Sequence, residues 1–175
     1  PQRRWYFLLE IDSQSFLLSL TLYGHDVKGN KATVSLALPA GTDYTALREE
    51  CRVGHTVAIL CATQQYFVDG TMGVKLYDET LFTMTVIPAT LAELMQISLL
   101  MKDIDTCSVC GEPAGDGCQK CGMRFCDVAC LRKVWVVRHK AECRAAAVIR
   151  EWRKLQWKSP LPEARVLWGA VSPHL

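Results

Sequence analysis

Long apolar runs and catalytic motifs are both missing from this sequence of 175 residues. Every apolar run ends well before the ~20 residues that a membrane-spanning helix requires, so we expect no membrane association. We find no nucleophile elbow, phosphate-binding loop, metalloprotease helix or catalytic pair of carboxylates, and we therefore expect a protein that is not an enzyme. Arg3 and Arg4 precede a strand-like pattern instead of a cleavable apolar segment. We predict no signal peptide and an intracellular location, in the nucleus or the cytoplasm.

Cysteine is nearly absent outside one short region. Seven of the nine cysteines lie between Cys107 and Cys143, and only Cys51 and Cys61 lie elsewhere. A secreted scaffold held by disulfides also concentrates its cysteines. Here the odd number, the C-x-x-C spacings and a nearby histidine indicate metal ligands in a reducing compartment. Cys51 and Cys61 are predicted to be small buried apolar groups.

Charge differs in sign between the two halves of the chain. Residues 1–106 contain 8 Lys and Arg against 12 Asp and Glu, whereas residues 107–158 contain 11 against 5. Seven thiolates and two Zn2+ ions would reduce the balance of the second half from +6 to +3. Half of the positive balance would therefore be offset by the metal site, and charge alone is weak evidence for nucleic-acid binding.

The first ninety residues show the period-two pattern of β-strands. A helix-like segment at 42–51 follows the third expected strand, and this order is that of an OB-type barrel, although other small β-barrels fit the same pattern. We therefore expect an α+β protein whose N-terminal part is a β-barrel, OB-like, of about five strands. The expected strands are residues 5–11, 15–23, 31–38, 56–62 continuing towards 67, 74–77 and 81–87.

The chain is predicted to divide into four parts. These are a barrel over 1–88, a connecting helix within 89–106, a cysteine-rich module over 107–143, and a C-terminal helix and tail over 144–175. The connecting helix is expected at 91–102, where its apolar side would pack on the barrel. Additional apolar residues at Ile97, Leu99 and Leu100 leave a dimer helix as the alternative.

Eight residues of the cysteine-rich module have the spacing of metal ligands. Two C-x2-C pairs begin the module, where a two-residue gap lets both sulfurs of a tight turn reach one ion. Gly111 and Gly122 follow these turns, at positions where a positive φ is useful. Two pairs four residues apart end the module, and such pairs share one face of a helix. The predicted ligands are Cys107, Cys110, Cys118, Cys121, Cys126, Cys130, His139 and Cys143.

Eight ligands are enough for two closed tetrahedral sites. A closed site leaves no coordination position for water or substrate, so we expect two zinc ions with a structural instead of a catalytic role. The spacing alone allows the ligands to pair sequentially or in an interleaved order. The linker between the two C-x2-C turns is rich in glycine and has no core-forming residue, so metal is expected to hold it.

The ligand string C-x2-C-x7-C-x2-C-x4-C-x3-C-x8-H-x3-C resembles the MYND-type zinc finger over residues 107–143. Phe125 before the fifth ligand, Trp135 and the H-K-x-x-C ending carry the resemblance. The resemblance implies interleaved pairing. One zinc would be held by Cys107, Cys110, Cys126 and Cys130, and the other by Cys118, Cys121, His139 and Cys143.

Two features depart from the family pattern. Leu131 stands after the sixth ligand, where the family has Gln, and three residues instead of two separate Trp135 from His139. One extra helical residue rotates His139 by ~100°. We therefore expect an irregular helix here, which breaks or tightens between Trp135 and His139, unless the ligand arrangement shifts.

The resemblance to MYND fingers also implies a protein-interaction module that receives a proline-containing peptide. The peptide groove would involve Asp127, Leu131 and Trp135, since a flat indole is a good surface for a proline ring. The alternative for Trp135 is packing inside the finger. We therefore expect a non-enzymatic, zinc-binding adaptor for a protein partner.

Two other functions stay open. Single-stranded nucleic acid could stack on the aromatic residues of the barrel, although the acidic balance of residues 1–106 argues against it. The chain could also be the regulatory part of a longer enzyme. The aromatic residues on which nucleic acid could stack are Tyr23, Tyr66, Phe67, Tyr77 and Phe82.

Overall fold

The computed structural model describes residues 5–17, 19–39 and 41–154, which form two compact units. The first unit contains residues 5–91 and the second contains residues 92–154. The predicted tail beyond residue 154 lies outside the described residues. Within the described residues, no helix has both the length and the apolar character needed to cross a membrane.

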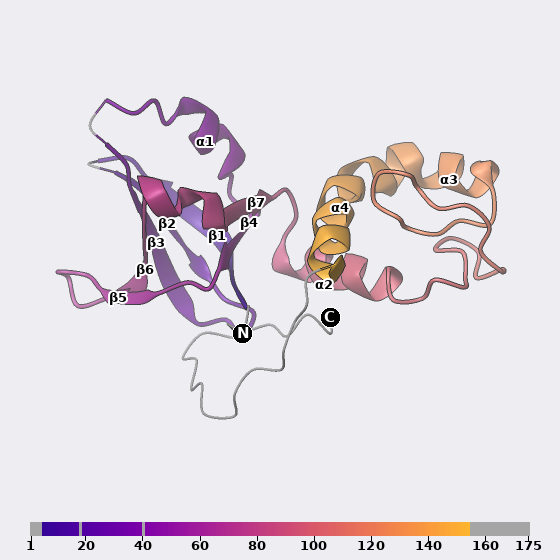
Figure 1. Cartoon of the computed structure of the whole chain (residues 1–175), viewed down its shortest axis with the longest axis horizontal. Helices are drawn as coiled ribbons and strands as arrows, with labels where there is room; N and C mark the ends of the chain where they lie inside the picture. Colours follow the sequence, from indigo (N-terminus) through magenta and orange to yellow (C-terminus); the bar gives the residue numbers. More distant parts are fainter. Residues whose placement is uncertain (1–4, 18, 40, 155–175) are drawn as a thin grey trace. The chain divides into compact units, whose positions relative to one another are not determined.

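The first unit is built on one seven-stranded sheet (Figure 1). The strand order is β5-β6-β3-β2-β1-β4-β7, and every neighbouring pair is antiparallel except β3 and β6, which are parallel. The elements are β1 (Tyr6–Ser15), β2 (Leu20–His25), β3 (Lys31–Ala37), α1 (Thr45–Glu50), β4 (Thr56–Leu60), β5 (Gln64–Tyr66), β6 (Met72–Tyr77), the 3-10 helix η1 (Asp78–Thr83) and β7 (Met84–Ile87).

The predicted α+β class is confirmed, whereas the sheet is not closed into a barrel. Among the described strands, β5 and β7 are the two edges of the sheet. Closure of an OB-type barrel would bring β4 beside β6. Here β4 lies between β1 and β7, and β6 lies between β3 and β5. Neither strand therefore has a free edge for the pairing that would close the barrel.

Two predicted strands differ from those observed. The strand expected from 56 towards 67 is interrupted at Cys61, whose φ of 51° lies in the left-handed region. Cys61 is exposed, which corrects the prediction that it is buried. Cys51 is buried as predicted, and burial together with the Glu50 charge raises the pKa of its thiol to about 12. The strand expected at 81–87 begins with η1 and is extended only from Met84.

The core of the first unit gathers alternate residues of five strands on one face of the sheet. Period-two alternation turns these side chains inward, and α1 and η1 add Leu47 and Leu81 to the cluster. The sequence pattern therefore assigns the buried face, even where it misplaces a strand end. The fully buried large side chains of this cluster are Phe7, Leu9, Ile11, Leu20, Leu22, Leu36 and Ile59.

Most of the described residues of the second unit are helical. The predicted connecting helix is observed as α2 (Leu91–Leu100), which starts at the boundary between the units. After it comes an irregular segment with two isolated bridges, Thr106 to Pro113 and Gly117 to Arg124. The chain then continues through α3 (Val128–Val134), a π-helical turn η2 (Trp135–His139) and α4 (Lys140–Lys154) without interruption (Figure 1).

Candidate metal centre

The eight predicted ligands come together in two groups of four. In each group the four ligand atoms all lie within 4.8 Å of one another, an arrangement that can hold a metal ion. The groups follow the interleaved order along the chain, one of the two orders that the spacing allowed. The first group is Cys107, Cys110, Cys126 and Cys130, and the second group is Cys118, Cys121, His139 and Cys143.

Sulfur separations in the first group fit a tetrahedral zinc site. With Zn–S bonds of about 2.3 Å, two sulfurs of a tetrahedron lie about 3.8 Å apart. The Cys110 sulfur lies 3.6 Å from that of Cys126 and 3.8 Å from that of Cys130. A disulfide would require about 2.0 Å. The thiols are therefore spaced for a shared ion and are not bonded to one another.

The second group has the same dimensions with a nitrogen in place of one sulfur. The sulfurs of Cys118 and Cys143 lie 3.8 Å apart. The Cys121 sulfur lies 3.7 Å from His139 Nε2, close to the ~3.6 Å of a tetrahedral site with one Zn–N bond. All four residues are buried, whereas Cys110 of the first group is exposed. The second group is thus enclosed by protein, and the first is open to solvent at one ligand.

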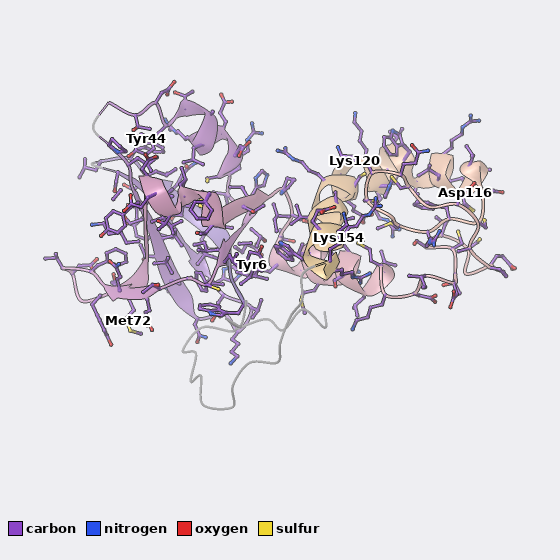
Figure 2. The ribbon with its side chains drawn as sticks, viewed as in Figure 1. Tyr6, Tyr44, Met72, Asp116, Lys120 and Lys154 are labelled. Carbon is purple, nitrogen blue, oxygen red and sulfur yellow. The ribbon has the colours of Figure 1, made fainter. Side chains whose placement is uncertain are left out.

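The two C-x2-C turns have the same backbone geometry. In each, the amide of the first cysteine donates to the carbonyl five residues later, at 2.8 Å. The carbonyl of that cysteine accepts from the amide of Gly111 in one turn and Gly122 in the other. These glycines have φ values of 76° and 81°, so the predicted positive φ is confirmed at both. Lys120, between the two ligands of the second turn, has an exposed side chain (Figure 2).

Backbone amides favour the charged form of the first cysteine in each turn. Burial raises the pKa of Cys107, but hydrogen bonds from the amides of Cys110, Cys126 and Val109 outweigh it and bring this pKa to about 6. The pKa of Cys118 is also lowered, again against burial, by the amides of Cys121 and Lys120. These thiols therefore lose their protons easily, as a metal ligand must.

Burial lowers the pKa of His139, and the Arg138 charge adds to this effect. The imidazole is therefore neutral near pH 7, which is the form that binds metal. The Phe125 ring stands edge-on to it at 5.2 Å between ring centroids, and the Trp135 ring lies 5.6 Å away on a tilted plane. Two aromatic rings thus hold His139 in place beside the Cys121 sulfur.

The extra residue before His139 is absorbed by the π-helical turn η2. The predicted irregularity is confirmed, but the helix widens where a break or a tightening was expected. The Lys140 amide reaches back to the Trp135 carbonyl, five residues earlier. A π-helical turn accommodates one more residue than an α-helical turn. His139 therefore lies on the ligand-bearing face with three residues between it and Trp135.

Deletion of Val137 is expected to leave the second group able to bind metal. The deletion leaves two residues between Trp135 and His139, and η2 is expected to become regular α-helix. Deletion of Ala141, between His139 and Cys143, removes a residue from regular helix and rotates one ligand away from the other by ~100°. Native mass spectrometry of the two variants should show both metals in the first and loss of one in the second. Equal loss in both would contradict the account of η2.

The predicted partner residues lie four apart along α3 and its ends. Asp127 caps α3, since its Oδ1 accepts from the Cys130 amide at 2.7 Å. Leu131 is half-buried, and Trp135 is 40% exposed while also contacting His139. Trp135 thus combines the two roles that the sequence left open: internal packing and an accessible indole. The helix-capping role of Asp127 was not predicted, although Asp is one of the residue types preferred at the N-cap of a helix.

Two arginines that were not predicted from the sequence connect α4 to the rest of the second unit. Arg150 donates to the carbonyls of Gln119 and Lys120, next to the second C-x2-C turn. Arg153 donates to the carbonyls of Ser98 and Met101 at the end of α2. Their spacing of three residues puts them on one helix face, which was the available signal.

Comparison of this chain with protein-family models, curated proteins and solved structures gives no match.

Proposed function

We propose that residues 107–143 are a two-zinc finger of the MYND type in a non-enzymatic adaptor that binds a proline-containing segment of a protein partner. The observation that carries this proposal is the pair of four-ligand groups with tetrahedral spacing. Soft thiolates with one imidazole are the ligand set of structural zinc. Within this scheme all ligands are used by the metal, so the finger contributes a shaped surface and no reaction.

An exposed apolar surface beside the second group supports binding of a partner. Val136 and Val137 are 83% and 86% exposed, and Val128 and Trp135 are exposed as well. Neighbouring apolar side chains in water are typical of interaction sites. Val136 and Val137 follow Trp135 directly in the π-helical turn η2. A proline ring on the free part of the indole would bury apolar area at a low entropy cost.

Truncation of Trp135 should weaken peptide recognition. Proline-containing peptides selected on the zinc-loaded chain are expected to bind, and Trp135→Ala should weaken them at least tenfold, because a buried aromatic anchor contributes about 2 kcal/mol or more. Fluorescence anisotropy measures the affinity. Phe82→Ala, which removes an aromatic residue 84% exposed in the first unit, is the matched control and should change nothing. Equal affinity for both variants, with both zinc ions present, would refute the groove.

A second candidate function concerns the first unit. We propose that its sheet is an opened relative of the OB barrel, supported by the β1-β2-β3 meander, the helix α1 after β3 and the parallel pairing of β3 with β6. A groove of about 790 Å3 lies along the ends of β2 and β3 and includes Tyr23 and Lys31. The function proposed for this groove is binding of single-stranded nucleic acid. Salt-sensitive, micromolar binding of labelled single-stranded DNA or RNA would favour this function over the adaptor.

A further inference from the structure

A pocket of about 380 Å3 lies beside the second metal group, entirely within the second unit. Its walls come from the end of α2, the second C-x2-C turn with its flanks, and one face of α4. This volume is in the range of small-molecule sites. The lining residues are Met101, Ile104, Gly117, Cys118, Gln119, Cys121, Gly122, Arg124, Arg150 and Arg153.

Three of the lining residues are arginines and none is Asp or Glu. The three arginines come from two separate segments, with Arg124 after the second C-x2-C turn and Arg150 and Arg153 on α4. A site that collects guanidinium groups without a carboxylate has an excess of positive charge. Such a site attracts anions, and guanidinium groups match the oxygens of phosphate and carboxylate in geometry.

Main-chain carbonyls orient the guanidinium groups of Arg150 and Arg153, and a weaker contact orients that of Arg124. Arg150 Nη1 donates to the Gln119 carbonyl at 2.7 Å. Arg153 Nη2 donates to the Ser98 carbonyl at 3.2 Å, and Arg124 Nη1 donates to the Gly115 carbonyl at 3.5 Å. A carbonyl orients a guanidinium without neutralising it. Each group has five N–H donors, so these bonds leave donors for a ligand.

The neighbouring metal group offsets only part of this charge. With Zn2+ bound, the three thiolates and the ion of the second group would sum to −1, and three arginines give +3, so the lining would keep a balance of +2. Met101 and Ile104 form an apolar wall next to the charged groups. This combination fits a small organic ligand that has an apolar part and a negatively charged oxygen group, such as a phosphate or a carboxylate.

We propose that this pocket is a binding site for the phosphate or carboxylate group of a small organic anion, held by Arg124, Arg150 and Arg153. The proposal is independent of the peptide groove, because the pocket shares no residue with Asp127, Leu131 or Trp135. Phosphate and carboxylate present the same planar pair of oxygens to a guanidinium, so the probes distinguish between them.

The test is a titration of the zinc-loaded full chain followed by 1H-15N NMR. The probes are phenyl phosphate, benzoate and, as the neutral control, benzyl alcohol. Phenyl phosphate, benzoate or both should shift the amide signals of Gly117, Gln119 and Gly122 in a saturable way. The probe that does so identifies the preferred anion, and benzyl alcohol should not compete. Absence of saturable shifts with both anions, or equal binding of benzyl alcohol, would overturn the proposal.

Arg124→Gln is the variant of choice, since its carbonyl bond is the longest of the three and its loss disturbs the fold least. It should weaken anion binding about tenfold, as expected for one charge-assisted hydrogen bond. Arg132→Gln makes the same charge change on an exposed residue of α3 outside the pocket and should leave the affinity unchanged. Equal affinity of the two variants would also overturn the proposal.

Discussion

Replacement of Cys121 by serine is expected to release the metal of the second group and to unfold the second unit around it. Cys121 is fully buried, and serine is a poor ligand for zinc. Structural zinc contributes about 10–16 kcal/mol in isolated finger peptides at pH 7, so loss of one ligand removes several kcal/mol. Few other forces hold this segment. Between residues 102 and 127, the buried apolar side chains other than cysteines are Met123 and Phe125.

The effect is measured by native mass spectrometry and by the dispersion of 1H-15N NMR signals from residues 107–154. Cys61→Ser is the matched control, because Cys61 is exposed and lies outside both groups. It should keep both metals and the full spectrum. The signals of residues 5–91 should persist in Cys121→Ser, since the first unit has its own core. A Cys121→Ser protein with an unchanged spectrum would show that metal does not hold the finger.

Gly24→Ala is expected to destabilise the first unit by about 3 kcal/mol or more. Gly24 pairs with Ile11 across β1 and β2, beside an irregularity in their register. A Cβ at Gly24 would lie 1.9 Å from the Glu10 carbonyl oxygen, which is part of the backbone of β1 and has no rotamer to change. The two strands must separate to admit the methyl group, and this disturbs the centre of the sheet.

Thermal unfolding followed by circular dichroism should show the transition of the first unit at a temperature roughly 10–20 °C lower. Gly70→Ala serves as the control. Gly70 has a φ of 79°, but nothing lies within 4 Å of an added Cβ, so only the backbone strain of about 1 kcal/mol applies. If the two substitutions lower the transition equally, steric contact with β1 does not explain the glycine at position 24.

The sequence was most informative where spacing is set by local geometry. A C-x2-C turn and a pair four residues apart on a helix each fix two ligands, so the eight donors could be named. Which pairs share an ion is a long-range property that spacing left open. Cys110 and Cys126 are 16 residues apart and yet their sulfurs are 3.6 Å apart. The same limit applies to the sheet. Alternation marked the inward residues, but pairing of β4 with β7 instead of β6 depends on contacts far along the chain.

Other features depend on conformations that periodicity does not encode. The left-handed Cys61 splits an otherwise continuous apolar strand pattern, and no glycine or asparagine signals it. In contrast, the spacing between Trp135 and His139 predicted an irregular helix, although a break or a tightening was expected and a wider π-helical turn is observed. The carbonyl contacts of Arg150 and Arg153 had only their helical spacing as a signal. This spacing is equally typical of a solvated helix face.

The metal content of the wild-type chain shows whether both groups of four ligands hold an ion. Native mass spectrometry of protein purified without added metal should give a mass that corresponds to two zinc ions per chain, one for each group of four ligands. Acidification that protonates the thiolates should return the mass of the metal-free chain. A chain that carries one zinc ion or none under native conditions would contradict the two-site account.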